Sequence, residues 1–340
     1  MIKNKYLGVI CFAAGVAMLC AQAVAQTAST GSGQAASTGS GQAYPNRPVR
    51  VIVPFAPGGA TDIVTRLLAQ KLTEAWGQTI VVDNRGGAGG NIGGELAAKA
   101  NADGYTLFMT SGSIVTANQY MYRKMPFNPS KELVAITGAA SGPQIIAVNP
   151  GFAAKTLKDF ITQAKAKPKT FTFGSAGFAT QTHLAGENFM YVAGMDAVHV
   201  PYKGEGPSLT DLVAGQLNFV TPNLAASIGF VTQGKLRALA VTSKERSKQL
   251  PDVPAVAETL AGFENLGWFG LMSATGTPKE VIQKVHADTT KALQSADLRA
   301  RLEQLGMMPY LKSPEAFTQT IKTESAHWAK IVRERNLVIN

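Results

Sequence analysis

Short hydrophobic runs alternate with amphipathic segments along most of this chain. The earliest runs predict strands at residues 49–54, 79–83 and 105–110, because they are short, rich in β-branched residues and bounded by turn signals. The segments between them, residues 62–76 and 92–100, carry apolar side chains at helical spacing. Regular alternation of strands and helices is typical of βαβ units with parallel strands.

The segment 62–76 shows the helical pattern most clearly. Its polar positions Arg66, Gln70 and Glu74 are predicted to face water, and Gly77 is a natural helix stop. The apolar positions predicted to share the opposite, buried face are Ile63, Leu67, Leu68, Leu72 and Ala75.

A second series of strands and helices follows residue 143. The predicted strands lie at residues 144–148, 170–174, 197–201, 217–221 and 236–242. The predicted helices lie at residues 157–166, 180–193 and 207–214. Two longer C-terminal helices, from residue 277 to about 294 and from residue 313 to about 335, begin with a capping residue followed by proline.

Two α/β units in tandem, with helices left over, predict a two-lobed α/β fold. Each lobe is expected to be a mostly parallel sheet flanked by helices, and crossing strands near 141–146 and 264–272 are expected to join the lobes. The predicted divisions are a signal peptide at 1–25, a linker at 26–43, the first part of lobe 1 at 44–143, lobe 2 at 144–266, and the return of lobe 1 with the C-terminal helices at 267–340.

The first 25 residues have the pattern of a cleavable signal peptide. Lys3 and Lys5 precede an apolar stretch that is too short for a stable membrane span, and Ala23-Val24-Ala25 is a small-x-small cleavage site. An uncleaved membrane anchor is the alternative. Residues 26–43 contain a repeated octapeptide of small and polar residues, which predicts a flexible tether.

Cysteine content and charge are consistent with a secreted protein that binds a small anion. Cys11 and Cys20 both lie in the segment to be removed, so the mature chain is expected to have no disulfide and no thiol chemistry. Losing Lys3 and Lys5 lowers the formal net charge from +10 to +8. The remaining positive residues are scattered, whereas a nucleic-acid surface would cluster them. A basic surface outside the cytoplasm raises the local concentration of anions.

The segment from Val53 to Asp62 is the most informative for function. A strand ends, Gly58 and Gly59 remove side chains, and a helix begins. Unpaired N–H groups and a partial positive charge at a helix N-terminus hold anions without a cation. Ligands bind at the carboxyl ends of strands in open α/β sheets. The alternative is a tight turn in which Thr61 or Asp62 merely caps the helix.

A second segment, residues 173–183, has the same construction of strand, small and hydroxyl-bearing residues, and helix start. Two such loops, one in each lobe, would grip a carboxylate from both sides of a cleft. His183 lies in the first turn of the second helix, where it either donates to a carboxylate or braces the loop. Ser175 lies one residue short of a G-x-S-x-G nucleophile elbow, so a secreted hydrolase stays an alternative.

Nucleotide and metal sites are not predicted. The glycine-rich segment 87–93 resembles a dinucleotide-binding loop, but the next strand ends without the acidic residue that would hold a ribose. The four histidines are not paired at metal-ligand spacing: His183, His199, His286 and His327. We therefore expect no cofactor and no metal.

An ordered set of motifs, spanning Tyr44 to Arg335, resembles the solute-binding receptors of tripartite tricarboxylate transporters, also called Bug-type receptors. Each motif is weak alone, but the ordered set is specific. The motifs lie at residues 44–50, 53–62, 83–93, 103–107, 183–187, 199–204 and 234–242.

The resemblance implies a type II-like periplasmic-binding-protein fold that closes about a hinge, with the ligand cleft between the lobes and no catalytic residue. It implies a periplasmic receptor for a small carboxylate that meets two integral membrane transporter subunits transiently and binds no nucleic acid; we expect a monomer. The ligand-binding residues that it indicates are Phe55, Gly58, Gly59, Ala60, Thr61, Asp62, Ser111, Ser113, Ser175, Ala176, Phe178, Thr180, His183 and Asn223.

The chain departs from the family pattern at Phe178, where the second loop usually has a small or polar residue. An aromatic ring there would either stack on a flat ligand, which makes an aromatic acid conceivable, or pack against its own lobe. A second alternative concerns the partner, because the same capture step would serve a receptor that signals to a sensor kinase.

Overall fold

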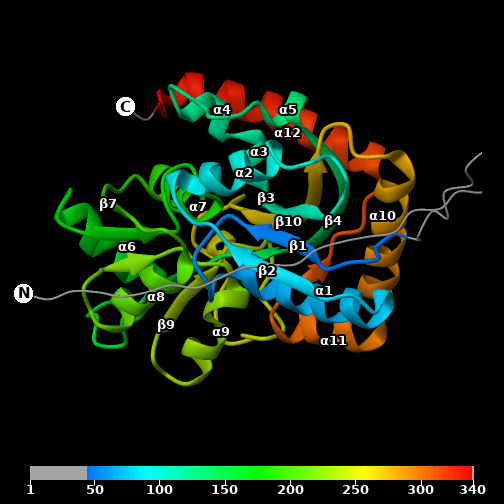
Figure 1. The fold of residues 1–340 in the computed structure, drawn as a ribbon. Coiled ribbons are helices and arrows are strands. Elements are labelled where there is room, and N and C mark those ends of the chain that lie inside the picture. The colour runs from blue at the N-terminus through cyan, green and yellow to red at the C-terminus, as the bar shows by residue number, and fades with distance from the viewer. Residues whose placement is uncertain (1–43, 339–340) are drawn as a thin grey trace, which may run out of the picture. The chain divides into compact units, whose positions relative to one another are not determined.

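The computed structural model describes residues 44–338, which form two β-sheets with helices packed on both faces of each (Figure 1). The first sheet has six strands in the order β11-β4-β10-β3-β1-β2. Its strands are β1 (Val49–Val53), β2 (Ile80–Asn84), β3 (Thr106–Ser111), β4 (Leu133–Pro143), β10 (Leu266–Ala274) and β11 (Met308–Pro309). The predicted signal peptide and linker lie outside the described residues.

The second sheet has five strands in the order β7-β6-β8-β5-β9. Its strands are β5 (Ile145–Val148), β6 (Thr172–Ser175), β7 (Val198–Pro201), β8 (Phe219–Val220) and β9 (Arg237–Val241). The predicted two-lobed α/β fold is confirmed, and we call each sheet with its helices a lobe.

Both sheets are mixed, which corrects the expectation of mostly parallel sheets. In the first lobe β1 pairs in parallel with β2 and β3, whereas β10 and β4 run antiparallel. In the second lobe β6 pairs in parallel with β7 and β8, whereas β5 runs antiparallel to β8 and β9. The antiparallel strands are those nearest the crossings: β4 continues almost directly into β5, and β10 brings the chain back after β9.

The helices of the first lobe cover both faces of its sheet. They are α1 (Ala60–Trp76), α2 (Asn91–Ala98), α3 (Gly112–Thr116), α4 (Asn118–Met121), α5 (Pro129–Glu132), α10 (Lys279–Gln294), α11 (Ala296–Gln304) and α12 (Pro314–Arg335), with a 3-10 turn η1 (Ala88–Gly90). Alternation along each strand divides the core: Val51 packs toward α1, α10 and α11, and its neighbour Ile52 packs toward α2, α3 and α12.

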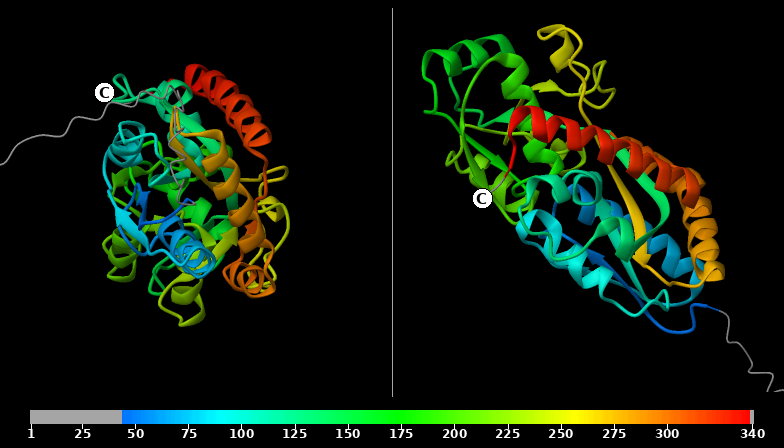
Figure 2. Two further views of the ribbon diagram at one scale, coloured as in Figure 1. Left: turned by 45° about the vertical axis from the view of Figure 1, so that its right-hand side comes forward. Right: turned by 90° about the horizontal axis from the view of Figure 1, so that it is seen from above.

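The second lobe has four helices and a 3-10 turn: α6 (Leu157–Ala166), α7 (Gln181–Ala193), α8 (Glu205–Val213), α9 (Leu224–Thr232) and η2 (Val256–Glu258). Phe160 and Phe189 pack α6 and α7 onto one face of the sheet, and Leu209 and Leu212 pack α8 onto the other. In the right-hand view of Figure 2 the green segments of this lobe gather at one end of the molecule, and α12, in red, extends along the first lobe.

Helix α1 begins two residues earlier than predicted and is rotated from the predicted face. Its buried residues include Thr61, Val64 and Thr65 together with the predicted Leu68 and Leu72. Ala75, predicted to be buried, is exposed. The rotation arises because the first turn packs against the second lobe as well as the sheet, so that even polar residues there are covered.

No helix within residues 44–338 is both long enough and apolar enough to cross a bilayer.

Candidate functional site

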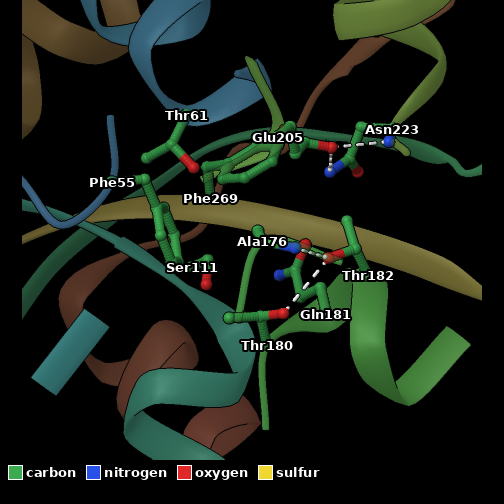
Figure 3. Close-up of a pocket in the computed structure, with 10 residues that line it drawn as sticks. All are labelled: Phe55, Thr61, Ser111, Ala176, Thr180, Gln181, Thr182, Glu205, Asn223 and Phe269. Carbon is green, nitrogen blue, oxygen red and sulfur yellow. Dashed lines mark hydrogen bonds between the residues drawn. The ribbon is translucent and has the colours of Figure 1, made fainter. Parts of the chain in front are cut away.

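A small pocket lies between the two lobes, at the carboxyl ends of β1, β3 and β6 (Figure 3). The free space between its lining atoms is about 220 Å³, part of which is open to solvent. Its lining residues come from both lobes: Phe55, Thr61, Ser111 and Phe269 from the first, and Ala176, Thr180, Gln181, Thr182, Glu205 and Asn223 from the second.

The N-terminus of α1 meets a carboxylate from the opposite lobe. Gly59 is the N-cap residue and provides no side-chain cap. Instead, the Ala60 N–H donates to Glu205 Oε2 at 2.7 Å. Glu205 Oε1 accepts from the backbone N–H of Asn223 at 2.7 Å and from its Nδ2 at 2.8 Å. Burial raises the pKa of Glu205, and these three N–H donors oppose that rise by stabilising the carboxylate.

Asp62 fixes the loop that precedes α1. Its Oδ2 accepts from the Gly58 N–H at 3.1 Å, and its Oδ1 accepts from Asn84 Nδ2 at 3.0 Å. Arg66, one turn later, donates to both oxygens. Burial opposes ionisation of this carboxyl, but the hydrogen bonds from Arg66, Gly58 and Asn84 lower its pKa overall. Gly58 has φ +87°, so a residue with a Cβ would be strained there.

The loop before α7 is held by its own side chains. Thr180 caps α7 by accepting from the His183 N–H at 3.3 Å. Thr182 Oγ1 accepts from the Ala176 N–H at 2.9 Å, and His183 Nδ1 accepts from the Ala179 N–H at 3.2 Å. His183 therefore braces the loop, which was one of its two predicted roles.

Ser175 and His199 form a buried pair beneath this loop. Ser175 Oγ lies 2.6 Å from His199 Nε2, and it also donates to the Gly177 carbonyl and accepts from the Gly177 N–H. Burial, with a smaller contribution from the neighbouring His183, lowers the pKa of His199 to about 3. Within residues 44–338, His199 Nδ1 has no hydrogen-bond partner, so no acid orients this imidazole as a hydrolase triad requires.

A second cavity adjoins the pocket and shares Gln181 with it. The free space between its lining atoms is about 360 Å³, part of which is open to solvent. Its lining residues are Gly112, Ser113, Thr116, Gln181, Leu184, Asn265, Leu266, Trp268, Glu324 and Trp328. Ser111 Oγ in the pocket and Ser113 Oγ in the second cavity are buried and have no partner among the described residues. Both hydroxyls are therefore available to a ligand.

The lobes touch around the pocket. The Ala56 N–H donates to the Lys203 carbonyl at 2.9 Å, and Gln181 Nε2 donates to the Trp268 carbonyl at 2.6 Å. Tyr122 donates from its hydroxyl to the Phe178 carbonyl at 3.1 Å. The pocket is thus enclosed by contacts between loops of different lobes.

The pocket brings together part of the predicted set. The predicted residues that line it are Phe55, Thr61, Ser111, Ala176, Thr180 and Asn223. Ser113 lines the second cavity. The predicted residues outside both linings are Gly58, Gly59, Ala60, Asp62, Ser175, Phe178 and His183. Phe178 is 38% exposed, and its ring lies edge-on to the His183 and His199 rings of its own lobe.

Four lining residues were not predicted: Gln181, Thr182, Glu205 and Phe269. Gln181 and Thr182 lie within the predicted loop segment 173–183, so their position in the sequence was the signal that could have identified them. Glu205 follows the Lys203-Gly204 turn at the start of α8, a third strand-to-helix junction that resembles the other two. Phe269 lies on β10 and carries no sequence signal of its own. Within residues 44–338, no cluster of acidic, histidine or cysteine side chains is placed to hold a metal ion.

Comparison with known proteins gives consistent matches over the described chain. The family described as "Tripartite tricarboxylate transporter family receptor" matches residues 64–337. BugT of Bordetella pertussis is 36% identical over 293 residues, which cover 86% of this chain and 90% of BugT.

Solved structures agree with this match. A structure described as a periplasmic transporter has a TM-score of 0.85 and 38% identity, covering 88% of this chain and 100% of its own. R. palustris Rpa4515, solved with adipate, has a TM-score of 0.83 and 33% identity, covering 85% of this chain and 97% of its own.

Proposed function

Because the chain belongs to the tripartite tricarboxylate transporter receptor family, we propose that it captures a small carboxylate between its lobes in the periplasm and delivers it to the two membrane subunits of such a transporter. Family membership supports a binding role, and the similar structure described as a periplasmic transporter supports the compartment. The predicted signal peptide is consistent with the same compartment.

One observation carries the proposal: the N-terminal turns of α1 and α7, from different lobes, meet at one pocket. Thr61, in the first turn of α1, lines the pocket, as do Gln181 and Thr182 in the first turn of α7. Helix N-termini carry partial positive charge and N–H groups that the helix itself leaves unpaired, which suit a carboxylate. In the closed arrangement the Ala60 N–H donates to Glu205 and the His183 N–H to Thr180. The Ser111 hydroxyl, which has no partner among the described residues, adds a donor beside them. The similar Rpa4515 was solved with adipate, a dicarboxylate.

Ligand capture would be coupled to lobe closure. The ligand would complete contacts from both lobes, and the closed surface would then be recognised by the membrane subunits. A sensor kinase would use the same closed surface, so transport and sensing share this step. Uptake of the bound acid by cells that lack the receptor, compared with cells that carry it, distinguishes the two.

Binding without turnover is the second part of the proposal. A hydrolase would need the Ser175 hydroxyl as its nucleophile. This hydroxyl is buried, donates to the Gly177 carbonyl and accepts from the Gly177 N–H, and Ser175 is not among the residues that line the pocket. Ester hydrolysis that disappears in Ser175→Ala would overturn this part.

A thermal-shift screen of residues 26–340 against aliphatic and aromatic acids tests the proposal. Ligand at a hundred times its Kd stabilises the folded state by about 2.7 kcal/mol, which gives a clear rise in Tm. We expect at least one carboxylate to raise the Tm, with neutral sugars and simple cations as controls. If only the sugars or cations raise it, carboxylate capture is wrong.

A further inference from the structure

Glu205 lies in the anion-binding position of the pocket. It starts α8 in the second lobe, yet its carboxylate reaches the first turn of α1 in the first lobe. Figure 3 shows the side chain pointing from its helix toward Asn223 along the edge of the pocket. The residue is 5% exposed, so its carboxyl group is almost fully removed from water.

The three partners of this carboxylate are all N–H donors: Ala60 N, Asn223 N and Asn223 Nδ2, at 2.7, 2.7 and 2.8 Å. Such a set complements an ionised carboxylate, which only accepts. Space has also been left for it, since a Cβ on Gly59 would lie 3.0 Å from Glu205 Oε2. The chain therefore supplies its own carboxylate where a helix N-terminus would otherwise hold an anion from solution.

The rest of the cleft adds a second carboxyl group and no positive side chain. In the adjoining cavity, Glu324 accepts with both carboxylate oxygens from Trp268 Nε1, each at 2.8 Å. Neither lysine nor arginine is among the described residues that line the two cavities. Like charges repel strongly where water is excluded, so each further carboxylate costs more than the last.

One ligand carboxylate still has donors available. The buried Ser111 hydroxyl has no partner among the described residues. Gln181 and Thr182, in the first turn of α7, line the same wall, and a helix leaves the backbone N–H groups of its first turn unpaired. These groups lie across the pocket from Glu205, as Figure 3 shows. A ligand whose single carboxylate faces them keeps its uncharged end toward Glu205.

We propose that Glu205 determines specificity by filling the place of a second ligand carboxylate, so that the receptor selects monocarboxylates over dicarboxylates of the same length. This inference rests on the proposed capture of a carboxylate and narrows the ligand to acids that carry a single negative charge. The preferred ligand carries one carboxylate and an apolar or hydrogen-bond-donating opposite end.

The test compares each dicarboxylate with its half-amide, which has nearly the same shape and one charge fewer. Calorimetry measures the ratio of the Kd of the diacid to the Kd of the half-amide, for chains of four to six carbons and for terephthalate. We expect a ratio above about ten in the wild type. In Glu205→Gln and Glu205→Ala the ratio falls at least tenfold, because the diacid binds more tightly once the fixed charge is gone.

Asp159→Asn is the matched control, since it removes an exposed carboxylate from the first turn of α6 in the same lobe. Its ratio should equal that of the wild type. The Gln variant keeps the size of Glu205, so it decides the result if the Ala variant does not fold. A wild-type ratio below one, which needs no variant, overturns the inference.

Two further outcomes separate this inference from the function on which it rests. If the half-amides bind and the ratio is unchanged in the Glu205 variants, the specificity role is wrong and carboxylate capture stands. If no mono- or dicarboxylate binds to the wild type, both are wrong.

Discussion

The two helix N-termini at the pocket are built in opposite ways. The start of α7 is satisfied locally: Thr180 caps it, and Thr182 and His183 bind amides of the preceding loop. The start of α1 has a glycine N-cap and takes its acceptor, Glu205, from the other lobe. The capping bonds of α7 lie within one lobe and would persist if the lobes were separated. The bond between α1 and Glu205 exists only where the two lobes meet.

Because of this difference, the state of the α1 N-terminus in the first lobe depends on the position of the second lobe, which carries Glu205. A helix N-terminus left without an acceptor favours any anion that reaches it. Separation of the lobes, which the proposed capture step requires, would take Glu205 away from the amide of Ala60. The α1 terminus would therefore lose the acceptor of its backbone amide, whereas at the α7 terminus only the Gln181 side chain would lose a partner, the Trp268 carbonyl.

The largest expected effect comes from Gly59→Val, which places bulk between α1 and Glu205. The new Cβ would lie 3.0 Å from Glu205 Oε2 and 3.4 Å from its Cβ, with the γ-carbons closer still. We expect the affinity for the carboxylate found in the thermal-shift screen to fall at least about a hundredfold, or about 2.7 kcal/mol. Calorimetry measures the change.

Gly229→Val is the matched control for this substitution, because a Cβ at Gly229 on α9 meets nothing within 4 Å. Its affinity should match the wild type. Full affinity in Gly59→Val would mean that the contact between α1 and Glu205 has no part in binding.

A smaller effect is expected from Asp62→Asn, which weakens the loop before α1 without touching the other lobe. Loss of the charged acceptor for Arg66, Gly58 and Asn84 should lower the free energy of unfolding by about 2 kcal/mol at neutral pH. The folded-state pKa of Asp62 is below its ordinary value of 3.8. Its stabilisation is therefore complete above 3.8 and is lost as the pH falls through the folded pKa.

Urea unfolding of both proteins from pH 7 down to the acid limit measures this linkage. The difference between wild type and Asp62→Asn should shrink below pH 3.8, the ordinary pKa of the carboxyl. A difference that is constant with pH would show that Asp62 acts by shape rather than by charge.

The sequence was sufficient for elements with a regular pattern and insufficient where packing overrode it. The helix predicted at 157–166 is confirmed as Leu157–Ala166, because its apolar positions follow one face. Most of β4 was not predicted, since glycines and a proline weaken a strand signal. The structure explains Gly138: a Cβ there would lie 2.1 Å from the Tyr310 carbonyl, so β11 and its neighbours require a residue without a side chain.

The site divides in the same way. The loops at Phe55–Thr61 and Ala176–Thr182 follow from local sequence, because strand ends, small residues and helix starts are local features. Glu205 does not follow, since a glutamate at a helix start is ordinarily a solvated residue that favours the helix dipole. Only the packing of α8 against α1 places that charge in the cleft, and packing between distant segments has no local signal.

An effect of about 1 kcal/mol is expected from Thr180→Ala, which removes the local cap of α7. Thr156→Ala is a matched comparison, because Thr156 caps α6 through Asp159 N in the same lobe and lies away from the pocket. Both variants should lose stability in urea unfolding, Thr180→Ala more than Thr156→Ala, because the buried Thr180 hydroxyl also donates to the Gly177 carbonyl whereas Thr156 is exposed. Only Thr180→Ala should also weaken ligand binding, since Thr180 lines the pocket. Equal affinities in the two variants would mean that the α7 terminus does not meet the ligand.

The smallest effect is expected from Phe178→Leu, paired with Phe55→Leu. Phe178 is 38% exposed, and its ring lies 5.7 Å from that of His183 and 4.8 Å from that of His199 (centroid to centroid), whereas Phe55 is 6% exposed and lines the pocket. We therefore expect Phe178→Leu to change affinity less than about threefold and Phe55→Leu to weaken it more than about tenfold, since only Phe55 lines the pocket. A larger loss in Phe178→Leu, confined to aromatic acids, would instead show that the α7 loop turns its ring onto the ligand. The α7 terminus would then depend on a group from outside its own lobe, the ligand, just as the α1 terminus depends on Glu205.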